Sequence, residues 1–173
     1  NVKRFIFVSS VKAGEPNIND HSKSIQDNHI PQGIYGETKR EAEMQLLDIT
    51  ENTSMNLTIV RPSLVYGQGS KGNLSIMLEG IKKGWFPRFP KVHNRRSMIH
   101  VDDLVSAILF LEGNQESYGE IYIATDGEDY SINKIYTALC NLAGKSYSKW
   151  EIPLFLLKII AKLNSNINYK VQK

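Results

Sequence analysis

The segment Arg4–Ser10 constrains the fold more strongly than any other part of the chain. It is apolar and rich in β-forming residues, which predicts a buried strand of a parallel sheet, and it ends in two serine hydroxyls. A second short apolar run, Leu57–Val60, predicts another buried strand. Arg61 and Pro62 should end that strand, because proline has no amide donor and restricts the residue before it. The two runs indicate an α/β fold.

An amphipathic helix is predicted between these strands, from Tyr35 to about Asn52, because apolar residues recur there at helical spacing among acids and bases. The polar stretch Val11–Pro31 before it has no sustained period and should form a long active-site loop. His21 and His29 lie in that loop, but without a third histidine or a carboxylate cluster nearby they do not predict a metal site.

Further elements are predicted in the second half of the chain. The proline- and aromatic-rich segment Gly84–Asn94 should form a packed loop. Asp102 is the expected N-cap of a helix that ends at Gly113, and a structural role is favoured for His100 just before it. The remaining elements are a strand over Glu120–Thr125, a helix capped by Ser131 that runs to Gly144, and a last helix from Ile152.

Tyr35 and Lys39 give the best indication of chemistry. They stand four residues apart, so they share one face of a helix and can act on the same substrate atom. The ordinary pKa of tyrosine is about 10, and a nearby ammonium stabilises the phenolate and brings that pKa toward neutrality. Ser10 stands at the carboxyl end of its strand, where ligands of parallel sheets gather. The alternative is a surface tyrosine and lysine without a role.

Taken together, the serine pair at a strand end and the Tyr-x-x-x-Lys pattern on the next helix resemble the extended short-chain dehydrogenase/reductases. Within that group, the chain is similar to the nucleotide-sugar epimerases and dehydratases. The similarity continues through Ile59–Gly67 and Asn94–Leu104, so it covers nearly the whole chain.

This resemblance implies the distal part of a Rossmann-type parallel sheet plus most of a small substrate-binding lobe. Residues 1–66 would be the C-terminal part of the Rossmann NAD(P)-binding domain, with the catalytic helix. Residues 67–173 would be mainly the nucleotide-sugar-binding lobe, interleaved with the last Rossmann elements. The family's Gly-rich dinucleotide-binding unit would precede Asn1, so the chain is expected to be a fragment.

The resemblance also implies roles for individual residues. Tyr35 would exchange the proton of the sugar 4-hydroxyl, Ser10 would hydrogen-bond the same oxygen, and Lys39 would lower the pKa of Tyr35 and hold the nicotinamide ribose. Arg96 matches a family arginine that faces the pyrophosphate, although Ser97 follows it where the family more often has Asp. The other implied contacts are Pro62 and Ser63 with the cofactor, and Leu64, Asn73 and Leu74 with the substrate.

The activity implied is that of an NAD-dependent UDP-hexose 4-epimerase that works through a 4-keto intermediate, with NADP also open as the cofactor. One alternative is a UDP-4-keto-6-deoxy-sugar 4-reductase of surface-polysaccharide synthesis. Another is a binding protein that keeps the fold without the chemistry. The partner would be a UDP-sugar, and a homodimer would form through the helix that carries Tyr35 and Lys39.

A glycine-rich pattern, Gly67–Gly72, has the G-x-G-x-x-G spacing of a phosphate-binding turn. We interpret it as a flexible loop before a substrate-binding helix and not as the cofactor fingerprint. Pro62 interrupts the strand that should precede it, and the first acid after it is Glu79, in the middle of a predicted helix. The fingerprint requires an acid at a strand end about 20 residues on.

Composition and charge narrow the classes of protein to which the chain could belong. The chain of 173 residues is 41% hydrophobic and 23% charged, so it is expected to be globular and cytoplasmic, and a net charge of +3 does not argue for nucleic acid. The longest apolar stretch, Ile152–Leu163, contains two lysines and is too short to cross a bilayer. Cys140 is the single cysteine and is expected to be a reduced core thiol.

Overall fold

The computed structural model describes residues 2–14, 31, 33–69, 72–90, 92, 94–148, 150–156 and 159. The chain divides into two compact units. The first unit is Asn1–Gly67 with Met98–Gly127, and the second unit is Gln68–Ser97 with Glu128–Lys173.

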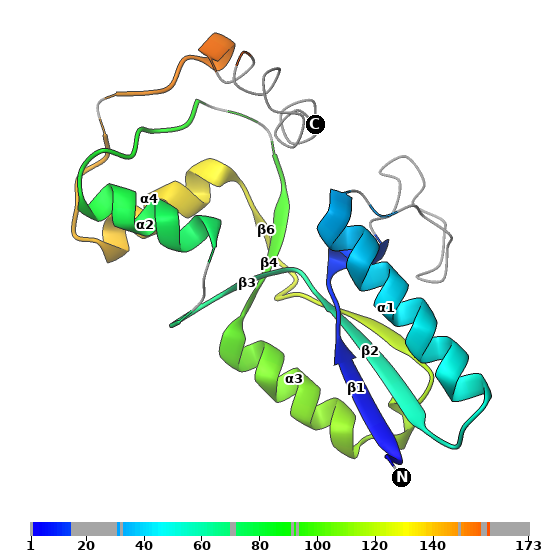
Figure 1. Ribbon diagram of the computed structural model, residues 1–173. Helices are drawn as coiled ribbons and strands as arrows, with labels where there is room; N and C mark the ends of the chain where they lie inside the picture. The colour runs from blue at the N-terminus through cyan, green and yellow to red at the C-terminus, as the bar shows by residue number, and fades with distance from the viewer. Residues whose placement is uncertain are drawn as a thin grey trace. The chain divides into compact units, whose positions relative to one another are not determined.

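A parallel sheet in the order β1-β2-β5 forms the centre of the first unit (Figure 1). Strand β1 (Arg4–Val8) pairs with β2 (Asn56–Pro62), which pairs on its other side with β5 (Ile121–Ala124). Parallel neighbours need a crossover, and helix α1 (Gly33–Glu51) supplies the one between β1 and β2. The predicted α/β arrangement is confirmed, and the helix lies within two residues of its predicted ends.

Helices α1 and α3 (Val101–Gly113) cover opposite faces of this sheet (Figure 1). Successive side chains of a strand point to opposite faces, and β2 shows both environments. Val60 packs in the core beneath α3, whereas the next residue, Arg61, bonds to Glu43 of α1. The buried core on the α3 side consists of Val60, Ile99, Leu104 and Leu111.

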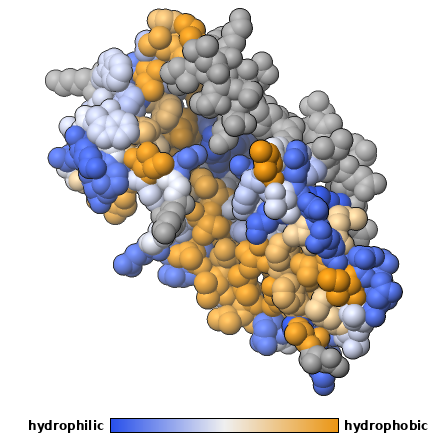
Figure 2. Space-filling model, viewed as in Figure 1, coloured by the Kyte–Doolittle hydropathy of each residue, from blue (hydrophilic) through white to orange (hydrophobic). Residues whose placement is uncertain are grey.

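Strand β1 is less buried than its sequence predicts. Phe5 and Val8 are 39% and 38% exposed, because β1 has a neighbouring strand on one side only in the described sheet. Apolar side chains also gather on the surface over α3, as Figure 2 shows. The exposed ones on that helix are Val105, Leu109 and Phe110.

Strand β2 extends past its predicted end and includes Pro62. Ile59 and Ser63 donate their N–H groups toward β5 at 3.0 and 2.9 Å, so the nitrogen of Pro62 between them faces the other side of the strand. On that side β1 has already ended opposite Val60. The proline therefore removes no ladder hydrogen bond, and the prediction that Arg61 and Pro62 lie beyond the strand was wrong.

Two further short strands continue the first unit. Strand β3 (Leu64–Tyr66) pairs in parallel with residues 98–100 of β4 (Arg96–His100), which leads directly into α3. A 3-10 helix, η2 (Gln115–Ser117), follows α3 and leads to β5, the strand predicted over Glu120–Thr125.

His100, and not Asp102, caps the N-terminus of α3. Its Nδ1 accepts a hydrogen bond from the Asp102 N–H at 3.3 Å, and its ring contacts Tyr66 edge-on at 5.2 Å between centroids. Asp102 lies instead in the first turn, where a carboxylate still interacts favourably with the helix dipole. The predicted N-cap was wrong by two residues because the helix begins immediately after the strand. The structural role expected of His100 agrees with these contacts.

The second unit is built on helices α2 (Asn73–Lys82) and α4 (Ile132–Leu142). The Ser131 Oγ accepts from the Lys134 N–H at 3.1 Å, which confirms the predicted cap of α4. Strand β6 (Asp129–Tyr130) pairs antiparallel with the first two residues of β4. The buried core is made of Met77, Ile81, Tyr136 and Cys140, and the thiol is free, as predicted.

The rest of the second unit has little regular structure. In the described part of Gly84–Asn94, the single element is a bridge between Arg88 and Glu151, in keeping with the predicted packed loop. The last helix was predicted to begin at Ile152, but Ile152 and Pro153 are not helical, whereas residues 154–156 and 159 are. The rest of that segment lies outside the described residues, as do His21 and His29. None of the helices in the described part of the chain combines the length and apolar character that a membrane crossing requires.

Candidate active site

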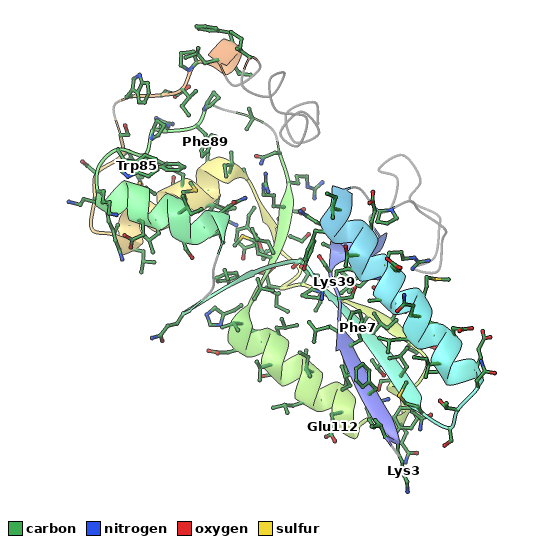
Figure 3. All side chains as sticks on the ribbon, in the orientation of Figure 1. Lys3, Phe7, Lys39, Trp85, Phe89 and Glu112 are labelled. Carbon is green, nitrogen blue, oxygen red and sulfur yellow. The ribbon has the colours of Figure 1, made fainter. Side chains whose placement is uncertain are left out.

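Tyr35 and Lys39 lie one turn apart near the N-terminus of α1, beside the carboxyl end of β1. The Lys39 Nζ donates a hydrogen bond to the Val8 carbonyl at 3.0 Å and lies 5.0 Å from the centre of the Phe7 ring (Figure 3). Val8 is the last residue of β1, so this bond fixes the start of α1 to the strand end. Tyr35 is 55% exposed, which leaves its hydroxyl accessible to a substrate.

Ser10 follows the same strand end and is buried. It leads into a short 3-10 helix, η1 (Val11–Gly14), in which the Ser10 Oγ accepts from the Lys12 N–H at 3.3 Å. The Lys12 Nζ in turn lies 5.8 Å from the centre of the Tyr35 ring. Lys12 was not predicted as a site residue. Its sequence position two residues after Ser10 gives no sign that the side chain turns toward the helix.

Gly36 allows α1 to approach η1 closely. A Cβ atom at this position would lie 2.5 Å from the Lys12 carbonyl oxygen, a distance at which one of the two backbones would have to move. The backbones of α1 and η1 are therefore in direct contact. This contact holds Tyr35, which precedes Gly36, close to the turn that carries Ser10.

A buried ion pair joins α1 to β2 on the same face of the sheet. Glu43 and Arg61 are 0% and 1% exposed. The Arg61 Nε and Nη2 donate to Glu43 Oε1 and Oε2 at 2.9 and 2.6 Å, and Arg40 Nη1 lies 3.3 Å from the same carboxylate. Burial acts to raise the pKa of Glu43, but the hydrogen bonds from Arg61 and the charges of Arg61 and Arg40 hold it below its ordinary value.

Acid should therefore weaken the fold through Glu43. The pKa of Glu43 is lower in the folded protein than its ordinary value, so the ionised carboxylate stabilises the fold fully at pH values above the ordinary carboxyl range. This stabilisation is lost as the pH falls through the folded-state pKa. Glu43→Gln should destabilise the protein at pH 7 by about 3 kcal/mol, as expected when one partner of a buried pair is lost, and by less in acid. Thermal melting from pH 7 to pH 3 measures this, with the exposed Glu41→Gln on the same helix as control. If the melting temperatures of the wild type and of Glu43→Gln differed by the same amount at every pH, this prediction would be contradicted.

Pro62, Ser63 and Leu64 connect β2 to β3 at the carboxyl end of β2. The Ser63 N–H donates to the Ala124 carbonyl at 2.9 Å, but its buried Oγ has no hydrogen-bond partner among the described residues. Leu64 is 37% exposed. A buried hydroxyl without a partner is costly, and a polar ligand group at this strand end would satisfy it.

Three of the predicted substrate contacts lie in the second unit. Arg96 is half-buried at the start of β4, and its Nε has no hydrogen-bond partner in the described part of the chain. The neighbouring Arg95 is exposed and bonds to Asp129. Asn73 and Leu74 form the first turn of α2, where Gly72 occupies the N-cap and provides no side-chain cap.

The glycine-rich loop follows a strand after all. Strand β3 ends at Tyr66, directly before Gly67, so the expectation that Pro62 removes the preceding strand was wrong. The second reason for rejecting the loop as a dinucleotide site still applies, because the acids that follow, Glu79 and Asp102, lie inside α2 and α3. No group of three or more His, Cys, Asp or Glu side chains in the described residues could hold a metal ion.

A family model and two similar curated proteins point to the same family. The family model described as the NAD dependent epimerase/dehydratase family matches residues 1–132. UDP-glucose 4-epimerase of Vibrio cholerae is 32% identical over 164 residues, which are 94% of this chain and 50% of that protein. The N-acetyl-alpha-D-glucosaminyl-diphospho-ditrans,octacis-undecaprenol 4-epimerase of Escherichia coli O157:H7 is 29% identical over 88% of this chain and 46% of that protein.

Solved structures agree with the fold. UDP-glucose 4-epimerase of Thermotoga maritima, determined with UDP-glucose, superposes with a TM-score of 0.72 at 24% identity, over 88% of this chain and 51% of that one. At this identity the match concerns the fold alone. The chain spans about half the length of the curated relatives that it matches.

Proposed function

Because the chain belongs to the NAD-dependent epimerase/dehydratase family, we propose that the complete polypeptide in which it occurs is a UDP-hexose 4-epimerase. The observation that carries this proposal is the grouping of Ser10, Tyr35 and Lys39 at the carboxyl end of β1. The grouping supplies an accessible phenol, a fixed ammonium and a buried hydroxyl at the strand end where ligands of parallel sheets bind.

The three side chains divide the proton chemistry between them. Tyr35, as the phenolate, accepts the proton of the sugar 4-hydroxyl and later returns it to the oxygen of the 4-keto sugar. The Ser10 Oγ accepts from the Lys12 N–H, which leaves its own O–H able to donate to the same sugar oxygen. Lys39 is held on the Val8 carbonyl one helical turn from Tyr35 and on the same face of α1, so its ammonium can bind the substrate or cofactor beside the phenol. A bound NAD would supply the hydride acceptor and donor for C4 of the sugar.

The residues present suit the nicotinamide end of the cofactor. The Ser63 hydroxyl, which has no partner among the described residues, and the adjoining Pro62 lie at the carboxyl end of β2, the neighbour of β1 in the sheet. Lys39 has further N–H donors besides the one that meets Val8, and these can bind the ribose hydroxyls. We assign Pro62, Ser63, Tyr35 and Lys39 to this part of the site.

The proposed uridine diphosphate contacts are Leu64, Asn73, Leu74 and Arg96. Arg96→Ala should weaken UDP binding by about 1.5–3 kcal/mol, the usual value of a hydrogen bond to a charged group, and should affect uridine less. Arg95→Ala is the matched control, because Arg95 is exposed and already paired with Asp129. Calorimetric titration with UDP and with uridine compares the variants. If Arg96→Ala lost the same affinity for UDP and for uridine, Arg96 would not be a contact of the diphosphate.

We also propose that the enzyme is a homodimer that pairs through α1. Three apolar side chains of this helix are strongly exposed: Ile34 at 83%, Met44 at 52% and Ile49 at 47%. Light scattering of the complete polypeptide gives its mass in solution. A monomeric mass at micromolar concentration would rule out this part of the proposal.

Cofactor turnover distinguishes the epimerase from the alternative reductase. The epimerase should convert UDP-glucose to its C4 epimer with no net change in NADH, because each hydride removed from the sugar is returned to it. A 4-keto reductase would instead consume NAD(P)H in proportion to product. Chromatography of the sugars with absorbance at the NADH band measures both quantities in one sample.

A further inference from the structure

We propose that the buried Glu43–Arg61 pair is a positioning device for the active site, which fixes helix α1, and thereby Tyr35 and Lys39, relative to the turn that carries Ser10. This inference rests on the proposed function of these residues. Neither Glu43 nor Arg61 touches the reacting atoms in this scheme, so both act through the residues that they hold.

Three elements meet at the Arg61 guanidinium. Arg61 belongs to β2, and its two bonds to Glu43 attach α1. Gly14, at the end of η1, packs against the flat guanidinium so closely that an added Cβ would lie 2.6 Å from the Arg61 Cζ. The pair therefore joins the sheet, the catalytic helix and the segment that begins just after Ser10.

Helix geometry connects Glu43 to the catalytic residues. Tyr35, Lys39 and Glu43 follow one another at intervals of four residues, so they lie along one face of α1, and Glu43 stands about 12 Å along the axis from Tyr35. Lys39 is attached to the end of β1 through Val8, and Glu43 is attached to β2 through Arg61. Two attachment points on one face fix the direction of a rigid helix. Tyr35 lies beyond both points, one turn toward the N-terminus of the same helix, so its position follows from theirs.

The chemistry of the pair fits this role better than a role in stability alone. A buried ion pair can often be replaced by apolar residues of similar volume with no loss of stability. A planar guanidinium that meets both oxygens of a carboxylate permits one relative orientation, whereas apolar contacts permit many. The ion pair therefore supplies a fixed orientation of α1, which apolar residues would not supply. Tyr35 and Ser10 require a fixed orientation to meet one substrate oxygen.

The experiment compares two variants of the complete polypeptide. Arg61→Lys keeps the positive charge but loses the second bond, and the double variant Glu43→Leu with Arg61→Met removes both charges together. We expect both to stay folded, with kcat reduced about 10²-fold, the cost of misplacing catalytic groups by about 1 Å. The sugar-nucleotide KM should change less than about threefold, because the lost interaction concerns the transition state. Glu41→Gln, an exposed change on the same helix, should leave kcat and the melting temperature unaltered.

The outcomes separate this inference from the proposed function. Wild-type kcat in the folded double variant would overturn the positioning role, and so would failure of both variants to fold, which would make the pair a requirement of the fold. Loss of activity in Tyr35→Phe with full activity in Arg61→Lys would refute the inference alone. Full activity in Tyr35→Phe would instead refute the proposed function.

Discussion

Replacing Tyr35 by phenylalanine should lower the turnover of the complete polypeptide by about 10³-fold and leave its affinity for the nucleotide sugar nearly unchanged. The substitution removes one oxygen, and general acid–base groups contribute about 10²–10⁴-fold to rates. Because Tyr35 is 55% exposed, loss of its hydroxyl should have little effect on folding. An interaction made in the transition state appears in kcat and not in binding.

Steady-state kinetics and a sugar-nucleotide titration test this expectation on the same preparation. Tyr147→Phe is the matched control, because it removes the same atom from a tyrosine of similar exposure, 50% against 55%. A Tyr35→Phe variant that retains turnover within tenfold of wild type would show that another group moves the proton.

The 173-residue chain by itself should bind NAD no more tightly than millimolar, equivalent to about −4 kcal/mol, and should not turn over a sugar nucleotide. Dinucleotide affinity in this fold depends on backbone amides of a glycine-rich turn that meet the pyrophosphate and on an acid that binds the adenosine ribose. The chain offers Gly67–Gly72 without an acid at the required strand end, so the nicotinamide end would bind alone.

Calorimetric titration of NAD into this chain measures the affinity directly. A micromolar dissociation constant would contradict the expectation. The variant Gly69→Val would then locate the site: Gly69 has a positive φ of 79° that valine rarely adopts, and a loss of tight binding would identify the Gly67–Gly72 loop as the dinucleotide turn.

Local patterns in the sequence predicted most of the elements. The apolar runs at β1 and β2 and the helical spacing of α1 and α4 correspond to observed elements because each reflects the burial of one face. Ends were less predictable, since they depend on neighbours distant in sequence. Pro62 remains in β2 because β1 stops opposite Val60, and Asp102 loses the N-cap to His100 because β4 continues to the first turn of α3.

The residues of the candidate site were likewise predictable from the sequence only in part. The Tyr-x-x-x-Lys spacing and the serine after β1 were sufficient to nominate Tyr35, Lys39 and Ser10. Glu43 and Arg61 were not nominated, because one is an acid among several charges on an amphipathic helix and the other is an arginine beside a proline. What makes them notable is that they are buried against each other 18 positions apart, which only the packing of α1 on β2 reveals.

The fate of the C4 hydrogen tests the central claim most directly. UDP-glucose that carries deuterium at C4 is incubated with the complete polypeptide, and the epimerised product is examined by NMR and mass spectrometry. If Tyr35 removes only the hydroxyl proton while the C4 hydrogen leaves and returns as hydride, the product should retain deuterium at the inverted carbon. Exchange of that deuterium for solvent hydrogen would contradict the account, because it would mean that the carbon itself is deprotonated.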